Sequence, residues 1–118
     1  MARLATSVFV SALIRRISDQ GGAAVVGRKG NGEAGEVFIA IWRATERAYV
    51  FFEPVSAYAT ESAGEMVGGR AFRRVPEVMD PIQLSARVER EAKFDTDFWL
   101  VEIEHCDQPI TRFVTVID

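Results

Sequence analysis

The segment from Glu36 to Trp42 constrains the fold more than any other part of the sequence. Both sides of this expected strand are apolar, with Val37, Ile39 and Ile41 on one side and Phe38, Ala40 and Trp42 on the other. A strand that is apolar on both faces requires cover on both faces. We therefore expect this segment to be the central strand of a sheet.

The neighbouring segments also have the composition of strands. Ala23–Arg28 and Ala48–Glu53 contain Val, Phe and Tyr side chains, which suit a half-buried pleated surface. The links from these segments to the central one are short enough for hairpins, which predicts an antiparallel meander. Further strands are expected at Arg70–Val75, Phe98–His105 and Ile110–Ile117, and residues 54–69 are expected to form a loop or a short irregular helix.

An N-terminal helix is predicted from the spacing of apolar residues. Val10, Leu13, Ile14 and Ile17 follow the i, i+3, i+4, i+7 pattern of an amphipathic helix. Thr6 or Ser7 is the expected N-cap, and the glycine pair at 21–22 is the expected stop.

A second helix has the clearest boundary signals in the chain. Asp80 is a good N-cap, Pro81 suits the first helical position, and Gln83 completes a capping box. Met79 and Leu84 are placed to form a hydrophobic staple across the cap. We expect this helix to end near residue 94.

The length and composition fit one globular domain. The chain has 118 residues, of which 48% are hydrophobic and 26% charged, and this balance excludes a disordered tail or a disulfide scaffold. The predicted order of elements gives an α+β fold over residues 1–118. Its antiparallel sheet has about five to six strands, with an N-terminal helix and a second helix before the last two strands.

The single cysteine and the charge pattern bear on location and partners. Cys106 is alone, so no intrachain disulfide and no cysteine metal cluster can form, and the cytoplasm is the expected compartment. The apolar run from Val8 to Ile17 is interrupted by Arg15 and Arg16 and is too short to cross a bilayer, so no membrane association is expected. We also expect no cofactor, no metal and no catalytic residue.

Four segments of the chain form a recognisable succession. They are S-A-L-I-R-R at 11–16, G-G-A-A-V-V at 21–26, E-A-G-E-V-F-I at 33–39 and F-D-T-D-F-W-L-V-E-I-E at 94–104. This succession resembles a family of small alphaproteobacterial proteins known as the domain of unknown function number fourteen ninety-one. The resemblance covers most of residues 3–104, although the family usually has proline where this chain has Thr96. It implies a single domain and no particular activity.

The segment from Gly30 to Gly35 formally matches the dinucleotide-binding pattern G-x-G-x-x-G. In a dinucleotide site these glycines lead from a strand into a helix, whose N-terminus faces the pyrophosphate. Here they lead into the expected strand at residues 36–42. A glycine-rich hairpin turn is therefore the preferred interpretation.

A group of carboxylates surrounds the expected strand at residues 98–105. Asp95 and Asp97 precede this strand and His105 ends it, so a divalent cation or acid–base chemistry is conceivable. The alternation of the strand places Glu102 and Glu104 on the opposite side from Asp97 and His105. Solvated or turn-capping carboxylates are therefore preferred over a site, and a catalytic pair of His105 with the adjacent cysteine is disfavoured for the same reason of alternation.

Six arginines are the remaining binding candidates: Arg15, Arg16, Arg28, Arg70, Arg73 and Arg74. On one surface they would bind phosphate groups. The net charge of −3 favours the simpler expectation that they pair with carboxylates of the chain itself.

Three hypotheses about function follow. The first is a non-catalytic module that binds a protein or a small ligand across its sheet, with self-association into a homodimer through strand edges or the exposed side of the sheet. Asp95, Asp97, Trp99 and the arginines are the candidate binding residues. The second is binding of nucleic acid or a nucleotide through the arginines. The third is a small enzyme that uses Asp95, Asp97 and His105.

Overall fold

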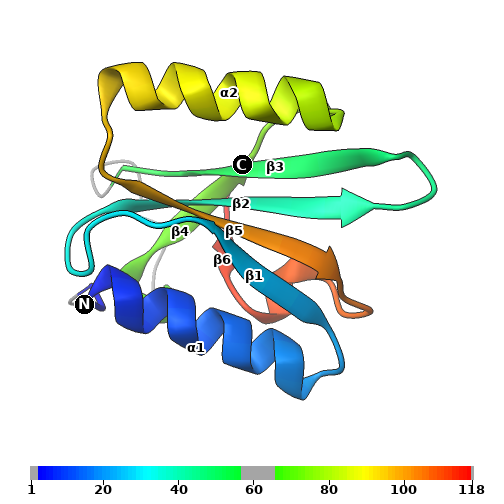
Figure 1. Cartoon of the computed structure of the whole chain (residues 1–118). Helices are drawn as coiled ribbons and strands as arrows, with labels where there is room; N and C mark the ends of the chain where they lie inside the picture. Colours follow the sequence, from blue (N-terminus) through cyan, green and yellow to red (C-terminus); the bar gives the residue numbers. More distant parts are fainter. Residues whose placement is uncertain (1–2, 57–65, 118) are drawn as a thin grey trace.

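The computed structural model describes residues 3–56 and 66–117 and shows two helices on opposite faces of one six-stranded sheet (Figure 1). Helix α1 spans Thr6–Asp19 and helix α2 spans Pro81–Phe94. We name the two sides of the sheet the α1 face and the α2 face. The expected α+β class and the placement of both helices are confirmed. The other elements are β1 (Ala23–Arg28), β2 (Glu36–Arg43), β3 (Ala48–Pro54), η1 (Val67–Gly69), β4 (Ala71–Arg74), β5 (Phe98–His105), η2 (Ile110–Arg112) and β6 (Thr115–Val116).

The sheet is mixed, so the expectation of a purely antiparallel meander is wrong. The strand order is β1-β5-β2-β3-β4-β6, in which β5 runs parallel to β2 and β6 runs parallel to β4. The β2–β3 hairpin is confirmed, but β1 pairs with β5 and not with β2. The physical reason is that residues 98–101 of β5 are all buried, so β5 also requires cover on both faces. It therefore takes a central place beside β2.

Each face of the sheet has its own hydrophobic core. On the α1 face, Val10, Leu13 and Ile17 of α1 pack against β2, β3 and β5. On the α2 face, Leu84 and Val88 of α2 pack against Phe38, Phe51, Phe98 and Leu100. The predicted central position of β2 is thus confirmed, since its side chains enter both cores.

The predicted boundary signals hold for α2 and fail for the start of α1. Asp80 caps α2 through a capping box with Gln83. Helix α1 begins after Ala5, which makes no side-chain cap. Thr6 does not serve as the N-cap because its hydroxyl is buried and donates to the carbonyl of Gly35 at 2.7 Å.

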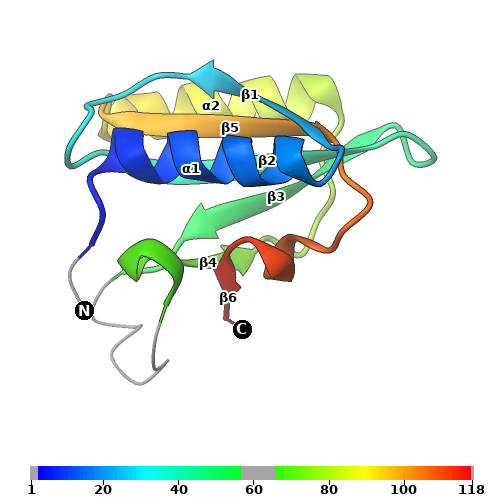
Figure 2. The same cartoon turned by 90° about the horizontal axis from the view of Figure 1, so that it is seen from below.

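The C-terminal segment crosses the α1 face and does not form the predicted continuous strand. After β5 the chain passes through η2 to the short β6, beside β4 (Figure 2). Phe113 and Val114 are adjacent and both buried, which the alternation of an ordinary half-buried strand does not allow. Within the expected loop at 54–69, η1 lies at Val67–Gly69, and residues 57–65 lie outside the described residues. No helix in the described ranges is long and apolar enough to span a membrane.

Candidate functional site

The glycine-rich segment at residues 30–35 is held in place by residues 95–99, the Asp-x-Asp-aromatic-Trp segment at the start of β5. The Asn31 N–H donates to Asp97 Oδ1 at 2.5 Å, and the Trp99 indole N–H donates to the Asn31 carbonyl at 2.7 Å. Asn31 Oδ1 in turn accepts from the N–H groups of Glu33 and Ala34, which folds the loop on itself. The two most distinctive motifs of the sequence are therefore two halves of one structural clamp, which we name the loop clamp.

Two of the three glycines of the loop clamp are required by close approach. A Cβ on Gly30 would lie 2.7 Å from the carbonyl oxygen of Phe98, and one on Gly35 would lie 2.9 Å from Asp97 Oδ1. The loop also closes the start of α1, because the Ser7 N–H donates to the carbonyl of Gly32 at 2.8 Å. The loop thus covers the N-terminus of α1, which precedes it in the chain, and leads into β2, so the strand–loop–helix arrangement of a dinucleotide site is not formed.

The carboxylates of the enzyme hypothesis do not meet. Asp97 is engaged in the loop clamp, and Asp95 accepts the Asp97 N–H at 2.8 Å. His105 lies at the far end of β5, about 25 Å away at the rise of an extended strand. Among the described residues no group of three or more His, Cys, Asp or Glu side chains is placed to hold a metal ion.

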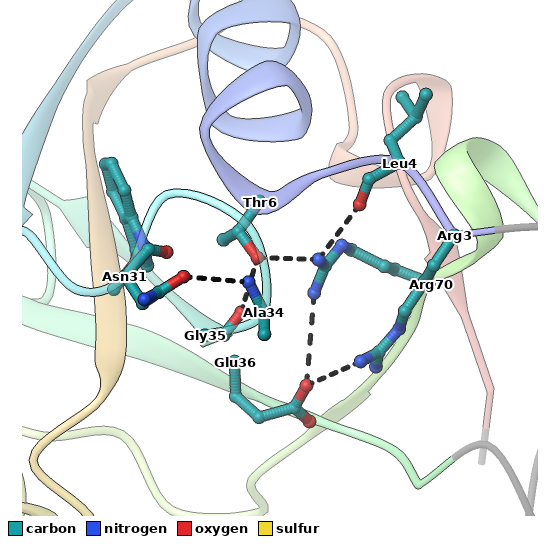
Figure 3. Close-up of polar contacts among 9 residues, drawn as sticks. Arg3, Leu4, Thr6, Asn31, Ala34, Gly35, Glu36 and Arg70 are labelled. Atoms are coloured by element: carbon teal, nitrogen blue, oxygen red, sulfur yellow. Dashed lines mark hydrogen bonds and ion pairs between the residues drawn. The ribbon is translucent and has the colours of Figure 1, made fainter.

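Arg70 is a buried structural residue at the junction of the N-terminal segment with β2 and β4 (Figure 3). Its guanidinium donates to the carbonyl of Leu4 at 3.1 Å and to Thr6 Oγ1 at 2.8 Å, and lies 3.9 Å from Glu36. Burial lowers the pKa of Arg70, and the nearby charge of Arg3 acts in the same direction, while Glu36 opposes both. Arg3 forms the closer ion pair with Glu36, at 2.9 Å.

The six candidate arginines do not gather on one surface of the described chain. Arg16 on α1 donates to the carbonyls of Phe113 and residue 112, at 2.8 and 2.9 Å. Arg28 lies on the α2 face, with its guanidinium carbon 4.3 Å from the centre of the Phe98 ring, and it donates to the carbonyl of residue 96. Arg15, Arg73 and Arg74 are exposed. Nucleic-acid binding stays a prediction, but the single arginine surface that it required is not formed.

A hollow lies where the parallel strands β2 and β5 end. Its volume is about 600 Å³, and we name it the strand-end hollow. Its floor on the α1 face is apolar, from Ile41, Phe52 and Ile103, and its outer wall is the chain that leaves β5. The complete lining is Ile41, Trp42, Arg43, Ala44, Thr45, Phe52, Arg74, Ile103, Glu104, His105, Cys106, Asp107, Gln108, Pro109 and Ile110.

The strand-end hollow is an incompletely filled part of the α1-face core. Ile41, Cys106 and Ile110 pack against that core but are only partly buried, and all three line the hollow. The volume is within the range of small-molecule sites, and the carboxyl ends of parallel strands are a common place for them. The geometry therefore suits a ligand with a substantial apolar part.

Opposite walls of the strand-end hollow carry opposite charges. Arg74 is the register partner of Phe52, so its side chain projects on the α1 face beside the apolar floor. It makes no hydrogen bond or ion pair with another described residue. At the β5 side, Asp107 lines the hollow, and its Oδ1 lies 3.5 Å from His105 Nε2. These two walls give an elongated ligand one preferred orientation.

Sequence reasoning found part of this lining and missed the rest. Arg74, His105 and Cys106 were singled out for other reasons, and the Cys106 thiol lies 3.4 Å from the carbonyl of Gln108. The sequence predicts strands over the segments that contain Ile41, Phe52 and Ile103, but it does not predict a hollow beside them. No local signal marks it, because the strands that form it are brought together only by the unexpected place of β5.

The described residues form a small α+β domain with two helices, a mixed sheet between them, and a hollow where β2 and β5 end. The model of the family described as "Protein of unknown function (DUF1491)" matches residues 4–111, and the chain belongs to this family. The expected resemblance is thus confirmed. No curated protein matches the chain.

Three solved structures share the fold over nearly the whole chain. A DUF1491 family protein from Caulobacter crescentus CB15, solved by crystallography, has 29% identity and a TM-score of 0.76, covering 99% of this chain and 100% of that one. The solution structure of protein Atu0922 from A. tumefaciens has 34% identity and a TM-score of 0.77, with 99% and 97% covered. An NMR structure of a C. crescentus DUF1491 protein has 32% identity and a TM-score of 0.75, with both chains fully covered. None of the three is described with an activity, a ligand or a partner.

Proposed function

We propose that this chain is a cytoplasmic binding module that takes a small amphipathic anion in the strand-end hollow. The apolar part of the ligand rests on Ile41, Phe52 and Ile103, and its anionic group lies against Arg74. The observation that carries the proposal is the Arg74 guanidinium, which stands beside an apolar floor and has no partner among the described residues.

The opposite wall supports the same choice of ligand. Asp107 repels an anion, so the anionic group is directed toward β4 and away from the end of β5. An apolar ligand body would cover Ile41 and Ile110, which the chain itself leaves partly exposed to water.

The probe for this proposal is 1-anilinonaphthalene-8-sulfonate, an apolar aromatic anion whose fluorescence rises when it leaves water. Arg74→Gln is the test variant, and Arg73→Gln is its matched control, because Arg73 is equally exposed but projects on the α2 face. An exposed charge contact of about 1 kcal/mol predicts about a five-fold weaker Kd for Arg74→Gln. Arg73→Gln should leave the Kd unchanged.

Two further measurements locate the binding. A neutral probe of the same shape, N-phenyl-1-naphthylamine, should bind both variants equally, because only the charge contact is removed. Amide chemical shifts should change around residues 41–45 and 103–110. Equal loss of affinity in both arginine variants, or shifts confined to other surfaces, would refute the proposed site.

A further inference from the structure

Strand β1 forms an open edge of the sheet. It is first in the strand order and pairs only with β5 among the described residues. Alternate residues of an edge strand direct their N–H and C=O groups away from the sheet, where they can pair with another strand. The opposite edge, β6, is only two residues long and offers much less backbone.

The β1 edge lacks the charges and prolines that protect many such strands, although register shifts interrupt its pairing with β5 between Ala23 and Ala24 and between Val26 and Arg28. Residues 23–27 read Ala-Ala-Val-Val-Gly and include no charge and no proline. Val25 and Val26 are 46% and 42% exposed, one on each face of the sheet. The one charged residue of β1, Arg28, is turned back over the Phe98 ring, with 4.3 Å from its guanidinium carbon to the ring centre.

An unpaired carboxylate lies over this edge. The Glu102 carboxylate extends from β5 across β1 at Gly27 and occupies the place where a side chain at Gly27 would begin. Glu102 makes no hydrogen bond or ion pair with another described residue, and Glu104 follows on the same face of β5. Burial raises the pKa of Tyr49, and the negative charges of Glu102 and then Glu104 raise it further.

The charge decides between two kinds of strand that would fit this edge. If a second copy paired with β1 about a two-fold axis, it would place its own Glu102 and Glu104 on the same face as the first pair. The two Glu102 carboxylates would then lie over the two paired β1 strands, and the only charge that β1 itself contributes is Arg28 at its end, which disfavours self-pairing. A segment that carries Lys or Arg supplies the missing positive charge.

We propose that the β1 edge binds an extended segment of another protein in which basic residues alternate with small or apolar ones. The segment adds a strand to the sheet through backbone hydrogen bonds. Its apolar side chains cover Val25 and Val26, and one basic side chain reaches the Glu102 carboxylate over Gly27. This interaction is separate from the strand-end hollow, so either proposal can fail without the other.

The experiment uses the whole chain, labelled with ¹⁵N, and two blocked heptapeptides. The first is Thr-Lys-Val-Lys-Val-Lys-Thr, and the second replaces each Lys with Glu. We expect the Lys peptide to bind saturably, to shift the amides of residues 23–28 and to slow their hydrogen exchange. The Glu peptide should show no binding.

Variants separate specific pairing from general attraction to an acidic chain. Glu102→Gln should weaken binding of the Lys peptide about five-fold. Glu46→Gln removes an equally negative but exposed residue from the β2–β3 turn and should have no effect. Val25→Lys, which adds a charge to the strand edge, should abolish binding.

Three outcomes would overturn the proposal. These are equal binding of the two peptides, equal effects of the Glu102 and Glu46 variants, and peptide shifts that lie away from β1. Sedimentation of the free chain provides a further test. A concentration-dependent dimer with β1 amides protected in the absence of peptide would assign the edge to a second copy instead.

Discussion

The loop clamp predicts that Asp97 and Trp99 stabilise the fold through one shared peptide unit. Asp97→Ala removes the acceptor of the Asn31 N–H, an exposed but charge-assisted hydrogen bond, and should cost about 1–2 kcal/mol of unfolding free energy. Trp99→Phe removes the donor to the Asn31 carbonyl and part of an indole that is only 5% exposed. It should cost about 2–3 kcal/mol.

The double variant provides the decisive comparison. Once either side chain is lost, Asn31 is free to move, and the second bond is already weakened. The double variant should therefore be less destabilised than the sum of the two single variants, by about 0.5–1 kcal/mol. Urea unfolding followed by far-ultraviolet circular dichroism measures all four proteins, and Glu46→Ala, at an exposed turn residue, serves as a control expected to change little.

The clamp interpretation has a clear point of failure. Strict additivity of the two changes would show that Asp97 and Trp99 act independently, and an Asp97→Ala variant as stable as the parent would show that the bond contributes nothing. In either case the distinctive motif before β5 would need a different explanation, and a role in binding would become the better one.

Three other predictions follow from buried or shielded groups. Arg70→Ala should lower the unfolding free energy by about 3 kcal/mol, because it leaves a cavity and removes the hydrogen bonds of a side chain that is only 3% exposed. Arg70→Met should cost less than half as much, because it fills the space and removes a buried Nε that has no hydrogen-bond partner in the described chain. Thermal unfolding measures both variants. In a Tyr58→Phe background, absorbance titration should give Tyr49 a pKa above its ordinary 10.0. The folded chain then keeps a proton that the unfolded chain loses, so the contribution of Tyr49 to stability is present below pH 10.0 and is lost as the pH rises through the raised pKa; a midpoint at or below 10.0 would contradict the structure. Ile17→Ala, at a position with 0% exposure, should lower the unfolding free energy by about 2–5 kcal/mol in urea, and a smaller loss would mean that the α1-face core relaxes around the change.

Local sequence signals predict an element correctly where that element depends on residues close together in the chain. Asp80, Pro81 and Gln83 predict the start of α2 correctly because a capping box involves residues only three apart. The same kind of reasoning failed at Thr6, because the hydroxyl that looks like a cap is drawn to the distant carbonyl of Gly35.

The order of the sheet could not be obtained from local patterns. The link at residues 29–35 has a length that suits a hairpin, and nothing in it shows that another strand lies between β1 and β2. The candidate site depends on that arrangement, since Ile41 and Ile103 become neighbours only when β5 lies beside β2. Arg74 was a candidate from composition, but its apolar surroundings come from Phe52 across the β3–β4 pair.

The insertion of β5 between β1 and β2 also has a consequence for how the chain folds. Val26 pairs with Val101, about 75 residues later in the chain, and Ile39 pairs with the same residue from the other side. During synthesis, β1 and β2 therefore emerge from the ribosome long before the strand that joins them. The centre of the sheet closes late, by contacts of long sequence separation, which slows folding relative to a meander of the same size. Until β5 arrives, β2 has only β3 beside it and its other edge is unpaired, so a nascent chain that stops before residue 98 leaves a strand with buried side chains open to pairing with another chain.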